Sequence, residues 1–570
     1  MHFNRHLKRG IWVCVGVIAA AAVWAIAVNY TAEQKRARAV AIEASGPAYA
    51  EEDILPHSGG KPSGGAGSKG RTGPGVPTKA RGAGEKGEAG SKAYARDNPD
   101  FIPDELLLSF ADSEDRARFI SRAEDAGVEV LDKSELRFSV RIRLPEGMTP
   151  EEAALLGPEP LEWGANYYVL VPEPPGGNRA TDAGVHTAFG AHALKWLGVE
   201  KNGDWGKGVT VAVLDTGVSV EAGIPAERVT RVKLSGGVKT EGESFTGHGT
   251  AVASLILGAW EEIAGIAPAS DVLSIEVLSD EGVGDAFTVA KGIVEAVERG
   301  ADVINLCLGT YGDNYLLKEA VTLAWNRGIP VVAAVGNDSA VGVCYPAGYE
   351  NVVGVTAVDA ARRHPYFANI GADVDISAPG LGLLAAWTGD ENTDFSGTSA
   401  AAPLVSGMLA MLLGSEKVMS GEKAVSILLA NCDDAGAGGR DDVFGEGVLN
   451  AQRVVERDVE GIYDVAAGDM RIVKDEDAGE YAAEICLQNR GTERVGSAVL
   501  EVEIEGVWRT AQFFDIEKGE TMTAAFPVDM ALYDENRPMR ARYRAVLQNE
   551  KDSRPENNAR DAVVLVPEEQ

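Results

Sequence analysis

The sequence has few cysteines and a deficit of positive charge. Only five of its 570 residues are cysteine, and one of them, Cys14, falls in an apolar N-terminal segment. Five cysteines do not make a disulfide framework, and no pair has the spacing of metal ligands, so we expect neither a metal site nor a cofactor. Lys and Arg number 53 against 86 Asp and Glu, a formal charge of −33 that argues against nucleic acid as a partner.

Histidine is also scarce, which narrows the search for a general base. Only His248 lies between two glycines, Gly247 and Gly249, and precedes an apolar run that predicts a helix. The other six lie near the N-terminus, in Gly-rich segments or in a polar turn: His2, His6, His57, His186, His192 and His364. A residue flanked by glycines can be approached closely by other groups, so His248 is the candidate base. The alternative is a histidine that caps a core helix.

The candidate nucleophile is Ser399, in the stretch Asp394-Phe-Ser-Gly-Thr-Ser-Ala-Ala-Ala-Pro403. The apolar run from Leu404 to Leu413 predicts a buried helix, and proline is tolerated near a helix start. Ser399 should therefore lie at or just before a helix N-terminus, where N–H groups and the helix dipole favour a negative charge. This arrangement suits a nucleophilic serine beside an oxyanion site. The alternative is a Gly/Ala-rich helix start without chemistry.

Two further polar residues end apolar strands. The run 209–214 predicts a strand buried on both faces, and it ends at Asp215, which could orient and stabilise the His248 imidazole. The run 330–335 ends two residues before Asn337, whose amide could donate to an oxyanion. The alternatives are a turn-forming aspartate and an asparagine that caps the next segment.

Taken together, the candidates follow the order Asp215, His248, Asn337, Ser399, which differs from the orders of chymotrypsin and of the α/β-hydrolases. With its motifs, the chain over about residues 190–455 resembles the subtilisin-like serine proteases, or subtilases. The matching motifs are Val213-Leu-Asp-Thr-Gly217, Gly247-His-Gly-Thr-Ala251, Ala334-Val-Gly-Asn337 and Gly397-Thr-Ser-Ala-Ala-Ala-Pro403.

The resemblance implies an Asp215–His248–Ser399 triad with Asn337 at the oxyanion. It also implies that Val283-Gly284 and Leu308-Gly309 pair with an extended substrate, while Gly309, Gly336 and Ala347 surround the side chain before the scissile bond. Cys307 stands where a serine is commoner in the family, and Cys344 precedes Tyr345. We expect both cysteines near the cleft.

Strands and helices alternate through the central part of the chain. We expect strands at 272–278, 303–308 and 330–335, and helices at 285–299 and 316–327. This alternation predicts an α/β fold, a doubly wound and mainly parallel sheet with helices on both faces. We place this catalytic domain at residues 191–455.

The N-terminal hundred residues suggest export. Residues 1–30 combine basic residues with the uncharged apolar segment 11–28, which predicts a signal retained as a membrane anchor or a cleaved secretion signal. Residues 31–100 are a Gly-rich flexible linker. The catalytic domain should therefore be anchored outside the cytoplasm, or secreted after processing.

Two smaller units flank the catalytic domain. Residues 101–175 predict an α+β unit that includes a strand at 136–144, and residues 176–190 form a junction. The position of the unit is similar to that of subtilase propeptides; the alternative is an ordinary accessory domain. Residues 460–570 predict an all-β sandwich resembling bacterial adhesion-type domains. Strands 500–505 and 539–545 alternate with Glu and Arg respectively, so we expect them to be neighbours with paired charges.

The sequence as a whole predicts an exported serine endopeptidase, made as a zymogen, that hydrolyses polypeptides through an acyl-enzyme. The alternative is a catalytically silent binding or adhesion protein on a subtilase scaffold, with the sandwich as its working part.

Overall fold

The computed structural model describes residues 100–172, 186–199, 203–234, 247–259, 262–389, 391–415, 419–474, 480–533 and 537–564. All of these belong to one compact unit, residues 76–570. The expected anchor, the linker up to residue 99 and residues 176–185 of the junction lie outside the described residues and remain predictions.

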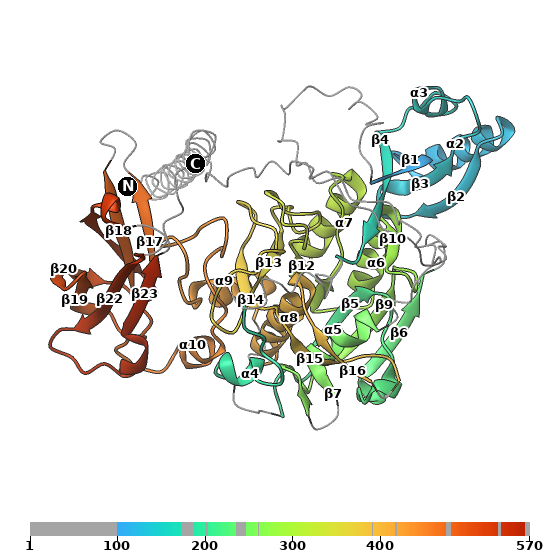
Figure 1. Cartoon of the computed structure of the whole chain (residues 1–570). Coiled ribbons are helices and arrows are strands. Elements are labelled where there is room, and N and C mark those ends of the chain that lie inside the picture. Colours follow the sequence, from blue (N-terminus) through green and yellow to red (C-terminus); the bar gives the residue numbers. More distant parts are fainter. Residues whose placement is uncertain are drawn as a thin grey trace, which may run out of the picture. The chain divides into compact units, whose positions relative to one another are not determined.

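The centre of the catalytic domain is a sheet of seven parallel strands in the order β14-β13-β12-β11-β5-β9-β6 (Figure 1). β5 is the first of these strands along the chain. β9 and β6 lie on one side of it, and β11, β12, β13 and β14 lie on the other. In such sheets ligands bind at the carboxyl ends of the strands, near the point where the order reverses. The strands are β5 (Thr210–Asp215), β6 (Val229–Lys233), β9 (Asp271–Glu276), β11 (Val303–Leu306), β12 (Val331–Ala334), β13 (Val352–Val358) and β14 (Ile376–Pro379).

Helices cover both faces of this sheet, which confirms the predicted α/β fold. On β5, Val211 and Val213 pack in the hydrophobic cluster that contains α5, α8 and α9. Ala212 and Leu214 point to the opposite face, into the cluster that contains α6 and α7. The helices are α4 (Ala193–Trp196), α5 (His248–Leu257), α6 (Ala286–Glu298), α7 (Tyr315–Asn326), α8 (Thr398–Ser415), α9 (Gly421–Ala430) and α10 (Ala451–Glu456).

The N-terminal unit is an antiparallel sheet in the order β10-β4-β1-β3-β2, so a catalytic-domain strand, β10 (Val283–Asp285), forms its edge. Its own elements are β1 (Phe101–Ser109), α2 (Ser113–Asp125), β2 (Glu129–Ser134), β3 (Ser139–Arg143), α3 (Pro150–Ala154) and β4 (Glu162–Leu170). The predicted strand at 136–144 is wrong at its start. Ser134 pairs with Ser139, so the residues between them form the hairpin turn, where Arg137 and Phe138 have positive φ.

The two faces of this N-terminal sheet pack against different partners. Leu106 and Leu108 on β1 lie in a cluster with Phe119 of α2. Leu107, between them, and Val169 on β4 instead join the cluster formed by α6 and α7 of the catalytic domain. The N-terminal unit therefore shares a hydrophobic core with the domain that follows it.

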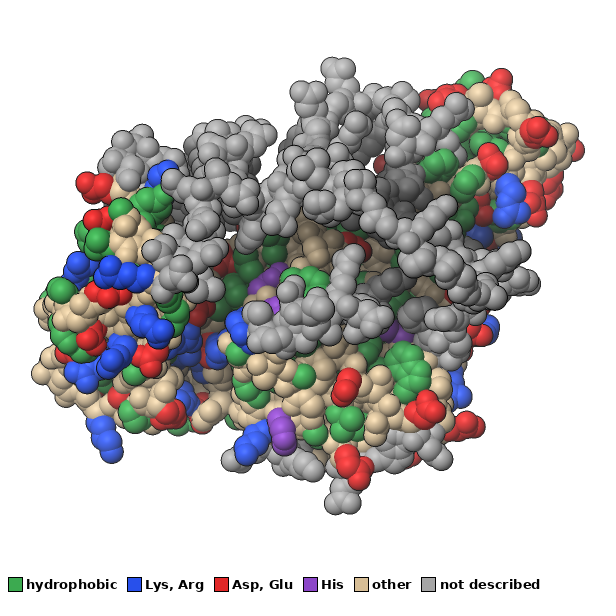
Figure 2. Space-filling model, in the orientation of Figure 1, with side chains coloured by type: hydrophobic (Ala, Val, Ile, Leu, Met, Phe, Trp, Pro, Cys, Tyr) green, Lys and Arg blue, Asp and Glu red, His purple; other side chains and the backbone are tan. Residues whose placement is uncertain are grey.

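The C-terminal unit has two antiparallel sheets, β17-β18-β21 and β20-β19-β22-β23, which share one hydrophobic core. As predicted, the Glu-rich and Arg-rich strands are neighbours: Glu501 pairs with Arg544 and Glu503 with Arg542. Side chains of both charges lie side by side on this unit (left in Figure 2). The strands are β17 (Val465–Lys474), β18 (Tyr481–Asn489), β19 (Val495–Ile504), β20 (Val507–Ile516), β21 (Thr521–Val528), β22 (Met539–Leu547) and β23 (Ala559–Val564).

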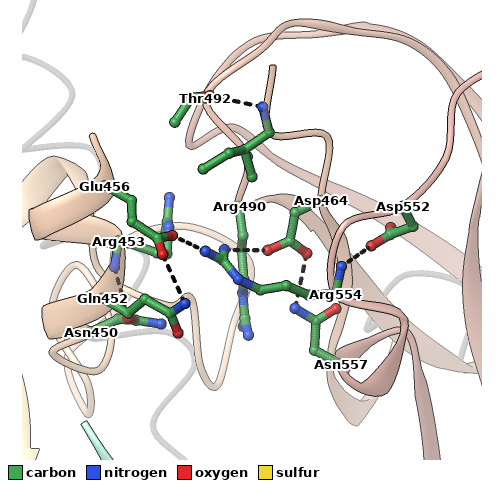
Figure 3. A network of polar contacts seen from close by, with 12 residues as sticks. Asn450, Gln452, Arg453, Glu456, Asp464, Arg490, Thr492, Asp552, Arg554 and Asn557 are labelled. Atoms are coloured by element: carbon green, nitrogen blue, oxygen red, sulfur yellow. Dashed lines mark hydrogen bonds and ion pairs between the residues drawn. The ribbon is translucent and has the colours of Figure 1, made fainter. Parts of the chain in front are cut away.

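Polar groups connect the C-terminal unit to α10 and to the loop after α9. Figure 3 shows Arg554 between Glu456 of α10 and Asp464, to which its Nη1 donates at 2.8 Å. Asp433, in the loop after α9, is buried and contacts three guanidinium groups, those of Arg362, Arg453 and Arg490. Arg490 follows β18, so the sandwich supplies part of this cluster.

Candidate active site

The candidate acid and base are in contact at the carboxyl end of the parallel sheet. Asp215 is the last residue of β5, and His248 is the first residue of α5. Both carboxylate oxygens of Asp215 lie 2.9 Å from Nδ1 of His248, and the Thr216 N–H donates to Oδ1 at 2.7 Å. This geometry makes Nδ1 the protonated nitrogen and leaves Nε2 as the basic one.

The glycines beside His248 are required by close packing. A Cβ on Gly249 would lie 2.4 Å from the carbonyl oxygen of Gly217, in the loop after β5. A Cβ on Gly247 would lie 2.1 Å from the indole of Trp387. Phe395 packs edge-on against the His248 ring, with centroids 5.3 Å apart. Trp387 follows β15 (Leu383–Ala386), and Phe395 is the last residue of β16 (Asn392–Phe395). The sequence motifs gave neither residue a role, although Phe395 lies in the stretch that contains Ser399.

Ser399 is the second residue of α8, so it lies at a helix N-terminus as predicted. Its side chain is buried. The helix begins before the apolar run, so Pro403 lies inside it rather than at its start. Since Pro403 has no N–H, the carbonyl of Ser399 four residues earlier receives no helical hydrogen bond. The thiol of Cys307, at the end of β11, donates to that carbonyl instead, at 3.4 Å.

A short chain of hydrogen bonds fixes Cys307. Ser406 Oγ on α8 donates to Oδ1 of Asn305 at 2.8 Å, and Asn305 Nδ2 contacts Cys307 Sγ at 3.2 Å. Burial, with a smaller contribution from the Asp215 carboxylate, raises the pKa of the Cys307 thiol well above its usual range. The thiol therefore keeps its proton and serves as a donor to the Ser399 backbone.

Asn337 is held by the residue that precedes Ser399. Its Oδ1 accepts hydrogen bonds from the Thr398 N–H at 2.9 Å and from the Thr398 hydroxyl at 3.0 Å. An N–H must meet an acceptor, which fixes the orientation of the amide. Nδ2 then lies over Gly397, where an added Cβ would be 2.7 Å away. The amide donor is thus directed to the start of α8.

Three atoms of this group are buried without a hydrogen-bond partner among the described residues: His248 Nε2, Ser399 Oγ and Asn337 Nδ2. Buried polar atoms normally have partners, because an unpaired one costs roughly 1–3 kcal/mol. The three atoms are a base, a hydroxyl and an amide donor. They are the groups that the attack of a serine on a carbonyl needs.

The predicted peptide-binding segments are occupied by β4 of the N-terminal unit. Val283 and Gly284 on β10 pair with Leu170 and Val169, and Leu170 exchanges two hydrogen bonds with Gly309, at 3.0 and 2.9 Å. Leu308 and Ala347 are buried in the core beside α6 and α7. Cys344, a residue the sequence placed only near the cleft, lies against Gly309 and within 3.5 Å of a Cβ added to Gly336, where Asn369 Nδ2 is closer, at 2.4 Å.

Within the described residues, no group of three or more His, Cys, Asp or Glu side chains could hold a metal ion. The one described helix that is long and apolar enough to cross a membrane is α8, and most of it is buried in the core.

Comparison with known proteins identifies the family. The model of the subtilase family matches residues 206–447. Subtilisin DY of Bacillus licheniformis is 31% identical over 279 residues, which cover 47% of this chain and 98% of that protein. The chain belongs to the subtilase family. Subtilisin Savinase of Lederbergia lenta is 34% identical to this subtilase over 43% of this chain and 90% of its own length. Among solved structures, the prenylagaramide maturation protease PagA matches 46% of this subtilase and 98% of its own chain, with 30% identity and a TM-score of 0.41.

Proposed function

We propose that this subtilase is a serine endopeptidase that hydrolyses peptide bonds of polypeptides. The observation that carries the proposal is the set of unpartnered buried atoms, His248 Nε2, Ser399 Oγ and Asn337 Nδ2, beside the Asp215–His248 contact. In a catalytically silent protein, three unpaired buried polar atoms would lower the stability of the fold without serving a reaction.

In the proposed mechanism, Ser399 Oγ attacks the substrate carbonyl and His248 Nε2 takes its proton. The tetrahedral oxyanion receives hydrogen bonds from Asn337 Nδ2 and from the backbone N–H of Ser399. His248 then gives the proton to the leaving amine, which leaves an acyl-enzyme on Ser399, and water releases the acyl group by the same steps in reverse. Asp215 holds His248 in the required tautomer throughout.

We further propose that residues 101–175 form an inhibitory propeptide. This is supported by β4, which ends between β10 and Gly309, where an extended substrate would bind. If the chain that follows Pro172 continues along the same path, its carbonyls would lie close to Ser399, and cleavage between Pro172 and Phe189 would need positioning only. Residues 1–30 would deliver the zymogen to or across a membrane, and processing would release the catalytic domain from that segment.

A fluorophosphonate probe tests the proposal, because only an activated serine reacts with it. We expect the processed protein to be labelled on Ser399 and the Ser399→Ala protein to remain unlabelled, inactive and uncut. A protein that folds, is processed by an added protease and still neither reacts nor hydrolyses peptides would favour the binding-protein alternative.

Asn337→Ala tests the oxyanion role separately. Loss of one oxyanion donor should lower kcat by about 10²–10³ with little change in KM, the size known for this asparagine in subtilisin. If KM alone rises, Asn337 binds substrate and does not stabilise the oxyanion.

A further inference from the structure

Cys344 fills the space between the two glycine segments that follow β11 and β12. A Cβ on Gly309 would lie 2.3 Å from Cys344 Sγ. A Cβ on Gly336 would lie 3.5 Å from the same sulfur and 2.4 Å from Nδ2 of Asn369, which borders the space on that side. The thiol donates to the carbonyl of Ala334 at 3.4 Å, and the Cys344 N–H donates to Val335 at 3.0 Å. The side chain is therefore fixed in place and buried.

The register of β4 indicates which substrate residue reaches this space. Leu170 and Gly309 form an isolated antiparallel bridge with two hydrogen bonds. Extended by two residues in the same register, it would bring Pro172 opposite Cys307. Cys307 donates to the backbone carbonyl of Ser399, so a residue opposite Cys307 would lie next to the nucleophile. In a substrate bound along the same path, that position is the residue before the scissile bond.

The protein's own residue at this position has a small side chain, the ring of Pro172. A large side chain would have to enter between Gly309 and Gly336, where the sulfur of Cys344 already lies. Movement of Cys344 is opposed by the hydrogen bonds that its backbone and thiol make to β12 and the segment after it.

We propose that Cys344 closes the pocket for the side chain before the scissile bond, so that this protease cleaves after small residues such as Gly, Ala and Ser. The inference rests on the proposed peptidase function and deepens it by naming the substrate class. Burial, with a smaller contribution from the Asp338 carboxylate, raises the pKa of the Cys344 thiol to about 12, so the group that closes the pocket is a neutral thiol.

Fluorogenic peptides built on the β4 sequence, Tyr-Val-Leu-Val-X-Glu, test the proposal with X as Ala or Phe. For protein expressed as the full chain and then processed, we expect kcat/KM for Ala to exceed that for Phe by at least about tenfold. Cys344→Gly should raise kcat/KM for Phe by at least about tenfold and change that for Ala little. Cys344→Ser is the matched control, because it keeps the size and the donor to Ala334 and should keep the preference for Ala.

Rates are normalised to the fraction of protein labelled by the fluorophosphonate probe, so that a poorly folded variant does not count as an inactive one. A wild-type preference for Phe, or an unchanged Ala/Phe ratio in Cys344→Gly, overturns the inference and leaves the peptidase function intact. Absence of both labelling and cleavage overturns the proposed function and, with it, this inference.

Discussion

The N-terminal unit shares a hydrophobic core with the catalytic domain, whereas the C-terminal sandwich has a core of its own. Leu107 and Val169 of the first unit pack with α6 and α7, while the sandwich residues form a separate cluster. The N-terminal unit also joins its sheet to β10, whereas the C-terminal unit joins through the ion pairs of Arg490 with Asp433 and of Arg554 with Glu456.

The N-terminal unit is thus held mainly by apolar burial and strand pairing, and the C-terminal unit mainly by charged groups. An added strand and an apolar face hold the N-terminal unit against β10 and Gly309, so its departure would expose these segments and its own apolar face. The sandwich would keep its own apolar core if its contacts loosened. The buried carboxylate of Asp433, however, would lose the Arg490 guanidinium, one of the three groups that balance its charge. Four variants test this contrast, with expected effects that decrease from Asp433→Asn to Glu501→Gln.

Asp433→Asn should weaken the C-terminal junction most. Burial alone would raise the pKa of Asp433, but Arg490, Arg362 and Arg453 outweigh it and hold that pKa well below its usual range. Removing the charge leaves three guanidinium groups close together, and breaking such a buried pair costs about 3–5 kcal/mol of unfolding free energy. Denaturant unfolding measures the loss.

The matched control for that variant is Asp515→Asn, in an exposed ion pair with Arg494 on the sandwich surface. Its loss should be about 0–1 kcal/mol. Equal losses for the two variants would mean that the buried cluster does not hold the junction.

Arg141→Ala should speed the release of the N-terminal unit after processing. Arg141 is buried between Glu105 of its own unit and Asp285 at the start of α6, with N–O distances of 3.2 and 2.8 Å. Its loss leaves two carboxylates facing each other, and we expect dissociation to be faster by about 10²–10³. Recovery of peptidase activity in the purified processed complex follows the release.

Arg137→Ala is the control for this contact, because Arg137 pairs with Glu319 of α7 at a more exposed position. Removal of an exposed pair should change the rate by less than about fivefold. Comparable rates for both variants would show that shared apolar burial alone retains the unit.

Asp434→Asn should change how the C-terminal junction responds to pH. Burial, with Asp441 and Asp469 adding to it and Arg490 opposing it, raises the pKa of Asp434 to about 7. The folded protein therefore binds an extra proton between about pH 4 and 7, and stability falls as pH rises through that range. The neutral variant should match wild type below about pH 4 and be more stable near pH 8, by roughly 1–3 kcal/mol.

Thermal unfolding at several pH values measures this difference between the two proteins. Equal stabilities at pH 8 would mean that Asp434 is already ionised without cost in the folded protein.

Glu501→Gln should have the smallest effect. Glu501 pairs with Arg544 across β19 and β22 at 2.5 Å, but the Arg544 side chain is exposed. Exposed cross-strand pairs contribute about 0.2–1 kcal/mol, and the midpoint of denaturant unfolding should move accordingly. A loss of unfolding free energy as large as that of Asp433→Asn would mean that exposed ion pairs stabilise the protein as much as the buried cluster does.

Much of the catalytic domain could be predicted because its signals are local. Apolar runs defined β5, β11 and β12, and the polar residues at their ends meet because parallel strands end at one edge of the sheet. The turn before β3 was missed because the alternation of 136–144 continues through a hairpin whose register depends on β2. The sequence also placed Cys344 only near the cleft, since its position between Gly309 and Gly336 depends on three separate segments.

The contact of Arg490 with Asp433 could not be predicted for a related reason. Each residue belongs to a different unit, and nothing in the pattern around either one specifies a partner that far along the chain. Pro403 was placed at a helix start by the usual rule for proline. In the structure the helix begins five residues before Pro403. The Cys307 thiol donates to the Ser399 carbonyl, which the missing N–H of Pro403 leaves without a helical donor.

The edge formed by β10 has a consequence for which proteins can be degraded. With β4 gone, Val283 and Gly284 present main-chain N–H and C=O groups to any chain that can lie beside them, and Gly309 does so on the other side. A segment within a helix or an inner strand already uses those groups, so it must first open locally. The rate of cleavage of a native protein would then follow how often such a segment opens. The protease would thus select substrates by their local stability as well as by the residue before the cut.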